Sequence, residues 1–443
     1  MSIYVDQEIY DLNNHIQKSK RTLRFTSGLK EIFRNKWKIV IFVFYTILSV
    51  FLWSKRNYIP IPEDISSFLE FIFHTARDII ICLLLFFGAV VLFSILSIPL
   101  GSRKIENELR RIGFINPSNE VPTLLSNHKS KKQSVIIMDF ECVGIPLVEW
   151  EKKQAELQTA LNGTIARIEQ GKNLRRIILY VLPHNAKKQK ELFWSDTYLC
   201  NDSSTLILGK GIIDNETVNL NTTPHILLGG STGSGKSVLL KNLLLQCVKK
   251  NAQVHIADFK GGVDYSSAWK NECNMIFDAE QLLTLLEDIV STLEHRKITF
   301  CDAGCPNIDS YNALHSDCEK LQRIIFACDE VAEILDKVGL EKAEKERICK
   351  IESCLSILAR QGRAFGIHII LATQRPDANI LTGQIKANLD MRICGKADKI
   401  LSQIVLDNSE AAEKIPKDAQ GQFITNTGIR FQGYMLDESK PIF

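Results

Sequence analysis

Two strongly apolar segments lie near the start of the chain. Residues 37–53 carry Lys38 as their single charge, and residues 79–100 carry none. A helix needs about 20 apolar residues to cross a bilayer core, and the tryptophans that bracket the first segment suit the membrane interface. The pattern therefore predicts a transmembrane hairpin. Two buried core helices are the alternative, which the lack of any polar face disfavours for the second segment.

Basic residues set the predicted orientation of this hairpin. The loop between the two segments holds Lys55, Arg56 and Arg77 together with four acidic residues. The positive-inside rule therefore predicts a two-pass protein of the cell membrane with both termini in the cytoplasm. A cleaved signal peptide is disfavoured, because the polar-rich stretch before the first segment is longer than a whole signal of about 15–30 residues. The flanking basic residues are Lys18, Lys20, Arg21, Arg24, Lys30, Arg34 and Lys36 before the hairpin and Arg103, Lys104, Arg110 and Arg111 after it.

Residues 101–223 alternate in character and predict a small α+β linking domain. The β-rich runs at 134–139 and 177–182 are interpreted as strands. Residues 149–170 are interpreted as one helix that stops at Gly171. The apolar positions at helical spacing in that run are Leu157, Leu161, Ile165 and Ile168.

The strongest motif follows this domain. Residues 224–229 form an apolar, strand-like run, and residues 238–248 form a helical run. Between them stands a full match to G-x-x-x-x-G-K-[ST], in the strand-to-helix context that a phosphate-binding P-loop requires. In such a loop, backbone N–H groups and the helix dipole hold phosphate, the lysine reaches the β- and γ-phosphates, and the next hydroxyl binds Mg²⁺. ATP and Mg²⁺ are the expected cofactors, held by Gly230, Ser231, Thr232, Gly233, Ser234, Gly235, Lys236 and Ser237.

A second motif supplies the acids that ATP hydrolysis needs. Residues 324–328 form an apolar strand that is followed at once by Asp329 and Glu330. Acids at a strand end are usually solvated caps, but the upstream P-loop favours a catalytic role here. Asp329 is expected to hold Mg²⁺ together with Ser237, and Glu330 is expected to polarise the attacking water. Nucleotide binding with hydrolysis is therefore favoured over binding alone.

Further strand-like runs complete the predicted sheet. Residues 367–373 and 391–394 are β-rich, and residues 421–424 with 429–436 are interpreted as a hairpin. Strands that alternate with helices predict a mainly parallel, doubly wound α/β sheet with an antiparallel edge. Gln374, at the tip of the strand 367–373, is a candidate sensor of the γ-phosphate, with a plain loop amide as the alternative.

Composition narrows the expected partners. The formal net charge is only +3, whereas a protein that coats nucleic acid is usually far more basic, so any DNA contact is expected to be local. The twelve cysteines lack the spacing of a zinc site, and single thiols inside apolar runs fit a reducing cytosol. The expected organisation is a cytoplasmic segment over residues 1–36, a transmembrane hairpin over 37–100, the linking domain over 101–223 and an ATPase domain over 224–443.

Several runs in the last third are far more specific than a P-loop alone. They are D-F-K-G-G at 258–262, G-R-A-F-G-I-H at 362–368, A-T-Q-R-P-D at 372–377 and G-Q-I-K-A-N at 383–388. With the P-loop, these runs make the chain resemble the FtsK/SpoIIIE family over roughly residues 149–443. The resemblance implies a RecA-like P-loop motor domain, a homo-hexamer and ATP-driven travel along DNA through backbone contacts without sequence specificity.

Two features differ from the FtsK-type segregation motors, which usually carry four membrane spans, a long low-complexity linker and a C-terminal winged-helix domain. This sequence shows two expected spans and neither of the other features. It therefore resembles the FtsK-like (TcpA-like) coupling proteins of conjugative plasmids and integrative elements in Gram-positive bacteria. That resemblance implies a membrane-anchored DNA translocase that delivers DNA, bound to a relaxase, to conjugation channel proteins.

Other functions stay open at this point. A type VII-like protein-secretion ATPase shares the fold family, although such proteins usually string several ATPase modules in one chain. A chromosome-segregation DNA pump is the second alternative. A nucleotide-gated membrane scaffold is the third, and it would need a defective acid pair, whereas Asp329 and Glu330 are both present.

Resemblance to ring motors also implies residues that act between subunits or on DNA. An arginine from the neighbouring subunit often stabilises the transferring phosphoryl group. Arg375 is favoured for this role, since the cations near a helix C-terminus are equally explained as dipole partners. The full set of candidate arginines is Arg360, Arg363, Arg375 and Arg392. The candidates for contact with DNA phosphates in the pore, or else plain solvated lysines, are Lys260 and Lys386.

Overall fold

The chain divides into two compact units. The computed structural model describes residues 22–25, 31–33, 35–59, 67–130, 135–183, 192–374, 383–438 and 442–443. The first unit is Met1–Lys187 and the second is Lys188–Phe443. The division therefore falls well before the boundary expected between residues 223 and 224.

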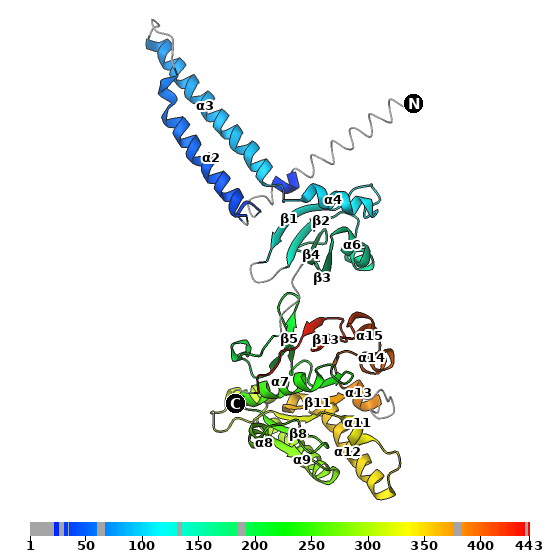
Figure 1. Cartoon of the computed structure of the whole chain (residues 1–443). Coiled ribbons are helices and arrows are strands. Elements are labelled where there is room, and N and C mark those ends of the chain that lie inside the picture. Colours follow the sequence, from blue (N-terminus) through cyan, green and yellow to red (C-terminus); the bar gives the residue numbers. More distant parts are fainter. Residues whose placement is uncertain are drawn as a thin grey trace. The chain divides into compact units, whose positions relative to one another are not determined.

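The first unit contains two long apolar helices, α2 (Lys36–Ser54) and α3 (Ser67–Leu96), which lie side by side (Figure 1). The short helix η1 (Arg56–Tyr58) follows α2. The Tyr45 hydroxyl donates to the Leu85 carbonyl at 2.6 Å. Gly88 permits this approach, because a Cβ there would lie 2.5 Å from the Tyr45 oxygen. Both helices are long and apolar enough to cross a membrane, and only 6% of the most apolar window of each is buried.

The observed bounds of the second helix differ from those of the expected apolar segment. The second helix starts at Ser67 rather than at residue 79 and ends at Leu96 rather than at residue 100. The early end follows from Pro99, since proline cannot continue a helix and disfavours helical backbone in the residue before it. Lys38, the single charge in the first apolar segment, donates to the Ile98 carbonyl at 2.8 Å and lies 3.4 Å from Glu31 Oε1. The charge is therefore paired within the protein.

A small α+β domain completes the first unit. Its antiparallel sheet has the order β1-β2-β4-β3. Trp150 lies at the centre of the core, with ring centroids 4.7 Å from Phe114 and 5.2 Å from Phe140. The elements are α4 (Ser102–Arg111), β1 (Thr123–Lys129), β2 (Ile136–Glu141), α5 (Leu147–Lys152), α6 (Gln154–Ala160), β3 (Gly163–Gln170) and β4 (Arg176–Pro183).

The single helix expected over residues 149–170 is wrong. Two short helices, α5 and α6, are followed by strand β3, which starts just after Asn162 in left-handed backbone (φ 48°). A β-bulge between Ile165 and Arg167 shifts the register of β3 against β4. Because a bulge adds one residue to a strand, Ile165 and Ile168 both pack on the core although they lie three positions apart. The bulge therefore imitates the spacing of a helix.

The second unit is built on one ten-stranded sheet with the order β6-β5-β14-β13-β12-β7-β11-β10-β8-β9. The strands from β12 to β9 are parallel, and the strands from β13 to β6 are antiparallel. This confirms the doubly wound α/β sheet with an antiparallel edge. The strands are β5 (Thr205–Gly211), β6 (Asn215–Asn219), β7 (Ile226–Gly229), β8 (Gln253–Ala257), β9 (Asn274–Ile276), β10 (Ile324–Cys328), β11 (Ile367–Thr373), β12 (Met391–Cys394), β13 (Gln422–Thr425) and β14 (Arg430–Gln432).

Helices cover both faces of this sheet, and successive residues of the central strands alternate between two cores. In β10, Phe326 packs in one core, whereas Ile325 and Ala327 pack in the other. Side chains of α9 and α12 fill the first core, and side chains of α7 fill the second. The helices are η2 (Asp196–Tyr198), α7 (Lys236–Lys249), α8 (Ser267–Glu272), α9 (Ala279–Asp302), α10 (Ile308–Leu314), α11 (Val331–Leu335), α12 (Lys342–Gln361), η3 (Arg363–Phe365), α13 (Gly383–Ala387), α14 (Lys399–Leu406) and α15 (Glu410–Lys414).

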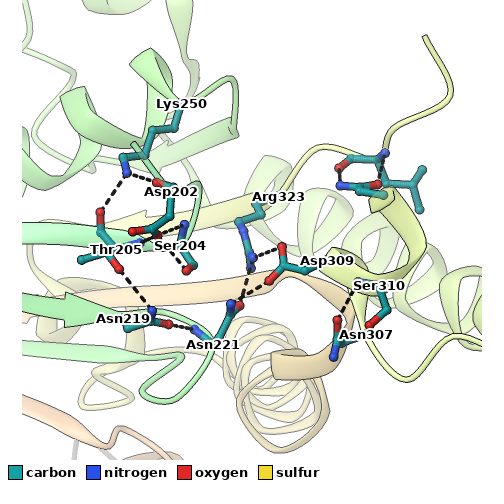
Figure 2. Close-up of polar contacts among 12 residues, drawn as sticks. Asp202, Ser204, Thr205, Asn219, Asn221, Lys250, Asn307, Asp309, Ser310 and Arg323 are labelled. Atoms are coloured by element: carbon teal, nitrogen blue, oxygen red, sulfur yellow. Dashed lines mark hydrogen bonds and ion pairs between the residues drawn. The ribbon is translucent and has the colours of Figure 1, made fainter. Parts of the chain in front are cut away.

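Strands β5 and β6 explain why the observed domain boundary differs from the expected one. β5 pairs with β14, with Phe431 opposite Gly211, and so extends the sheet of the ATPase domain. Polar contacts also tie this edge to the rest of the second unit (Figure 2), since Lys250 Nζ at the end of α7 donates to the Thr205 carbonyl at 2.9 Å. Residues 192–223 therefore belong with the ATPase domain rather than with the linking domain.

Candidate nucleotide-binding site

The P-loop lies between β7 and α7, in the context that the sequence predicts. Gly233 and Gly235 both have left-handed backbone, with φ of 73° and 93°. Only glycine adopts this backbone at no steric cost. At Gly235 an added Cβ would also lie 3.0 Å from the Gly421 nitrogen, so the loop packs closely against the segment before β13. The helix that starts at Lys236 points its N-terminus at this loop, which is the usual arrangement of an anion-binding site.

Lys236 and Ser237 both contact Asp329 at the end of β10. Lys236 Nζ donates to the Asp329 carbonyl at 2.6 Å and to Asp329 Oδ1 at 3.0 Å. The Ser237 hydroxyl lies 3.1 Å and 3.3 Å from the two carboxylate oxygens of Asp329. The side chains of Lys236 and Asp329 are each 3% exposed, so this is a buried ion pair. The two sequence motifs, about ninety residues apart, therefore meet at one point.

Glu330 is held by the neighbouring strand. The Thr373 hydroxyl donates to Glu330 Oε1 at 2.9 Å, and the Gln374 backbone N–H donates to Glu330 Oε2 at 2.9 Å. The Gln374 side chain extends the contact toward the P-loop, because its Oε1 accepts from the Thr232 hydroxyl at 2.9 Å. Gln374, the candidate sensor, thus lies between the P-loop and Glu330.

A third carboxylate lies beside these groups. Asp258, directly after β8, accepts from the backbone N–H groups of Lys260 and Gly262, each at 3.0 Å. This turn places Lys260 Nζ 3.9 Å from Asp329 Oδ2, so the residue proposed for the pore borders the nucleotide site. Burial raises the pKa of Tyr265 well above its usual value, and the negative charges of Asp329 and Asp258 add to this effect.

The sequence patterns assign no role to Asp258 or Thr373. Asp258 carries the same signal as Asp329, an acid directly after an apolar strand, and could have been found by it. Thr373 carries no such signal, because it is the last residue of β11 and its importance comes from the neighbouring strand β10.

The arrangement fits MgATP chemically. A hydroxyl (Ser237) and a carboxylate (Asp329) converge beside a lysine, and Mg²⁺ prefers hard oxygen ligands of this kind. Lys236 provides a positive charge for phosphate oxygens. Glu330 provides a carboxylate at the carboxyl end of the sheet, where ligands of doubly wound folds bind.

Three of the candidate trans arginines and the pore candidate Lys386 have their described contacts outside this site. Arg360 donates to the Ser356 carbonyl within α12, and Arg363 donates to the Asn221 carbonyl near the start of β7. Arg392 and Lys386 both pair with Asp407, the latter at 2.6 Å. Arg375, the favoured arginine, lies outside the described residues. The described candidates that could act between subunits or on DNA are therefore Arg360, Arg363, Arg392, Lys260 and Lys386, all of which have contacts within this chain.

Comparison with known proteins finds relatives over the region that holds this site. Residues 191–378 match the model of the FtsK/SpoIIIE family. The DNA translocase FtsK of Campylobacter jejuni is 35% identical over 213 residues, which make up 46% of this chain and 22% of that protein. The DNA translocase SftA of Bacillus subtilis is 29% identical over 247 residues, or 53% of this chain and 25% of that protein. The chain thus spans about a quarter of the length of these curated relatives.

A solved structure matches over a longer range. The pCW3 conjugation coupling protein TcpA, in its monomer form with ATPγS, is 33% identical to this chain. The match covers 77% of this chain and 97% of that chain, with a TM-score of 0.57. Sequence and fold therefore point to the same group of proteins, and the resemblance noted from the motifs is confirmed.

Proposed function

The chain belongs to the FtsK/SpoIIIE family of P-loop ATPases, and from this premise we propose that it is a membrane-anchored, ATP-driven DNA translocase. Its specific task is that of a coupling protein, which delivers DNA bound to a relaxase to a conjugation channel. Support for this task comes from the match to a conjugation coupling protein, which extends over nearly all of that chain.

The single observation that carries the ATPase part is the convergence of two distant motifs. Lys236 and Ser237 from the P-loop meet Asp329 from the end of β10, with Glu330 next in sequence. A P-loop that only binds nucleotide does not need an acid pair at this position. The combination of phosphate ligands with a carboxylate for water therefore favours hydrolysis.

Each side chain has a role in this proposal. Ser237 and Asp329 hold Mg²⁺, which neutralises charge on the phosphates when it is bound. Lys236 contacts the β- and γ-phosphates, and Glu330 accepts a hydrogen bond from the attacking water. Gln374, whose side chain contacts Thr232 of the P-loop, senses the γ-phosphate.

Assembly, DNA contact and location are further parts of the proposal. The working form is a homo-hexameric ring in which Arg375 of one subunit completes the site of its neighbour. DNA passes through this ring by contacts to its phosphates, which carry no sequence information. Helices α2 and α3 anchor the ring in the cell membrane as a two-pass hairpin with both termini in the cytoplasm. Their length and apolar composition support the two membrane spans, and the flanking basic residues support the orientation.

ATP hydrolysis by the full chain in lipid nanodiscs, with and without duplex DNA, tests the motor. We expect strong stimulation by DNA. Lys236→Ala and Glu330→Gln are each expected to lower the stimulated rate at least about 100-fold, because the first removes a positive charge from the phosphates and the second removes the carboxylate that accepts a hydrogen bond from the attacking water. Hydrolysis that is indifferent to both duplex and single-stranded DNA would contradict a DNA motor and favour protein export.

Transfer between cells tests the coupling task separately. In a host that carries the conjugative element, a Glu330→Gln allele is expected to abolish DNA transfer while leaving cell division normal. A defect in chromosome segregation with normal transfer would instead identify a segregation pump. Complementation with the wild-type gene in trans is the control for effects of the mutation on neighbouring genes.

A further inference from the structure

Both carboxylate oxygens of Glu330 accept hydrogen bonds from the end of β11. One donor is the Thr373 hydroxyl and the other is the Gln374 backbone N–H, each at 2.9 Å. Glu330 is 7% exposed and Thr373 is 3% exposed, so these bonds lie away from bulk water. The carboxylate is therefore fixed in orientation by two donors on the neighbouring strand.

The two donors differ in how easily they can be changed. The Gln374 N–H is part of the backbone, so its position follows from the pairing of β10 with β11. Thr373 is β-branched, and such side chains have few χ1 states, so its hydroxyl is a rigid donor. Only this hydroxyl depends on the identity of a side chain, which makes Thr373 the residue that determines the second hydrogen bond.

The same strand end also contacts the P-loop. Gln374 Oε1 accepts from the Thr232 hydroxyl at 2.9 Å, and the Gly230 N–H donates to the Thr373 carbonyl at 3.3 Å. Residues 373 and 374 therefore contact Glu330 through two donors and the P-loop through two acceptors. Glu330 is thereby held at a defined position relative to the loop that binds the phosphates.

We propose that Thr373 is a positioning residue for ATP hydrolysis, which fixes the Glu330 carboxylate toward the attacking water. This inference rests on the proposed ATPase activity. An ionised carboxylate has about four acceptor positions, so two bonds from β11 orient the group and still leave it able to accept from water. Without the Thr373 hydroxyl, the carboxylate turns about the single remaining bond and spends less time facing the water.

Thr373→Val, which keeps the β-branched shape and removes the hydroxyl, tests the proposal in the full chain. We expect kcat for DNA-stimulated hydrolysis to fall about 10- to 100-fold, which is less than the loss of about 100- to 10,000-fold that is typical when the proton-transfer group itself is removed. KM for ATP is expected to stay within about twofold, because the substitution keeps the Thr373 backbone carbonyl that contacts the P-loop. Thr373→Ser, which restores the hydroxyl, is expected to recover kcat to within about threefold of the wild type.

A double-mutant cycle separates positioning from a general structural role. Because Thr373 acts through Glu330, Thr373→Val is expected to have no further effect on the residual rate of Glu330→Gln. An equal loss in both backgrounds would overturn the proposal, as would an unchanged kcat or a raised KM with normal kcat. Thr373→Ala serves in the same cycle if the valine variant does not fold, and binding of a fluorescent ATP analogue confirms the integrity of each variant.

The outcomes also separate this inference from the proposed function. A wild-type chain that does not hydrolyse ATP overturns both. A wild-type chain that hydrolyses ATP with DNA stimulation, together with a Thr373→Val variant of equal kcat, overturns the role of Thr373 alone.

Discussion

An ion pair with a buried cation lies at each end of the parallel sheet in the second unit. At the carboxyl ends of the strands, Lys236 Nζ lies 3.0 Å from Asp329 Oδ1. At the amino ends, Arg323 Nη2 lies 2.6 Å from Asp309 Oδ1. Both cations are almost completely buried. Neither the distance nor the burial of the cation tells which of the two pairs serves a ligand.

The pair at the amino ends belongs to a wider hydrogen-bond network, part of which Figure 2 shows. Arg323 also donates to Asn221 Oδ1 at 2.9 Å and to His368 Nε2 at 3.1 Å. The other ring nitrogen of His368 donates to the Pro224 carbonyl at 3.1 Å. This network, called the amino-end cluster below, joins α10, the segment before β7, the residue before β10 and the start of β11. Its members are Asn221, His225, Asp309, Arg323 and His368.

The pair at the carboxyl ends differs in its surroundings. It lies beside a glycine-rich loop with left-handed backbone and beside the acids that end β8 and β10. Doubly wound sheets bind ligands outside the carboxyl ends of their strands. Position in the sheet and backbone geometry therefore separate a binding site from a structural network, whereas burial and ion pairing alone do not.

The largest effect on activity is expected from Ser237→Ala. ATP hydrolysis should fall at least about 100-fold, or about 2.7 kcal/mol in activation free energy, because the hydroxyl that would hold Mg²⁺ is lost. The free energy of unfolding should fall by only about 1 kcal/mol, the usual contribution of one hydrogen bond. Steady-state hydrolysis and hydrogen exchange in β10 and β11 measure the two quantities.

Ser237→Thr is the matched control, since it keeps the hydroxyl, and it should retain activity within about tenfold of the wild type. If Ser237→Ala instead unfolds the second unit while the remaining folded protein hydrolyses ATP normally, the carboxyl-end pair is structural and the comparison fails.

Arg323→Met should have the opposite pattern. The change keeps an apolar stem but removes the donors to Asn221, Asp309 and His368, so the free energy of unfolding of the second unit should fall by about 3 kcal/mol. Hydrolysis per folded molecule should change less than about twofold, because the cluster lies at the end of the sheet away from the P-loop. Urea dependence of hydrogen exchange in β10 and β11 gives the stability.

Asp309→Asn is the matched variant on the other side of the pair. Asp309 is 44% exposed, so water takes up much of its charge and the loss should be only about 1 kcal/mol. Equal losses in the two variants would show that the ion pair itself, rather than the satisfaction of buried donors and acceptors, holds the amino-end cluster.

The fold of the second unit could largely be predicted from the sequence. Strands Ile324–Cys328, Ile367–Thr373 and Met391–Cys394 have the expected bounds. Parallel strands with helices on both faces are continuous apolar runs, and such runs are conspicuous in a sequence. The linking domain could not be predicted in the same way, because the bulge after Ile165 gives β3 the spacing of a helix.

The candidate site likewise contains residues that the sequence predicts and residues that it does not. The P-loop and the acid pair are local motifs, so their residues could be named from the sequence. The roles of Asp258 and Thr373 depend on β8, β10 and β11 lying side by side, which is a property of strand order. The closeness of Lys260 Nζ to Asp329 Oδ2, at 3.9 Å, could not be predicted from the sequence either, because it follows from the turn after β8.

A smaller effect, confined to the amino-end cluster, is expected from a change in pH. Burial lowers the pKa of His225 to about 4, and its Nδ1 accepts a hydrogen bond from the Ile369 N–H at 3.1 Å. In the unfolded chain the pKa returns to about 6.5, so between these values the unfolded state binds more protons. Protonation of His225 in the unfolded chain therefore destabilises the fold below about pH 6.5 and has no effect above it. The free energy of unfolding should be about 2 kcal/mol lower at pH 5 than at pH 7.5.

His225→Asn isolates this effect, because Asn Oδ1 can take the place of Nδ1 as acceptor while the titrating ring is removed. The loss between pH 7.5 and pH 5 should shrink by about 2 kcal/mol in this variant. Part of the remaining pH dependence of the free energy of unfolding should come from His368, whose pKa is held well below its usual range by burial and by the neighbouring Arg323. Unfolding measured by hydrogen exchange at both pH values decides the matter. If the free energy of unfolding of His225→Asn depends on pH as strongly as that of the wild type, protonation of His225 does not contribute to the stability of the amino-end cluster.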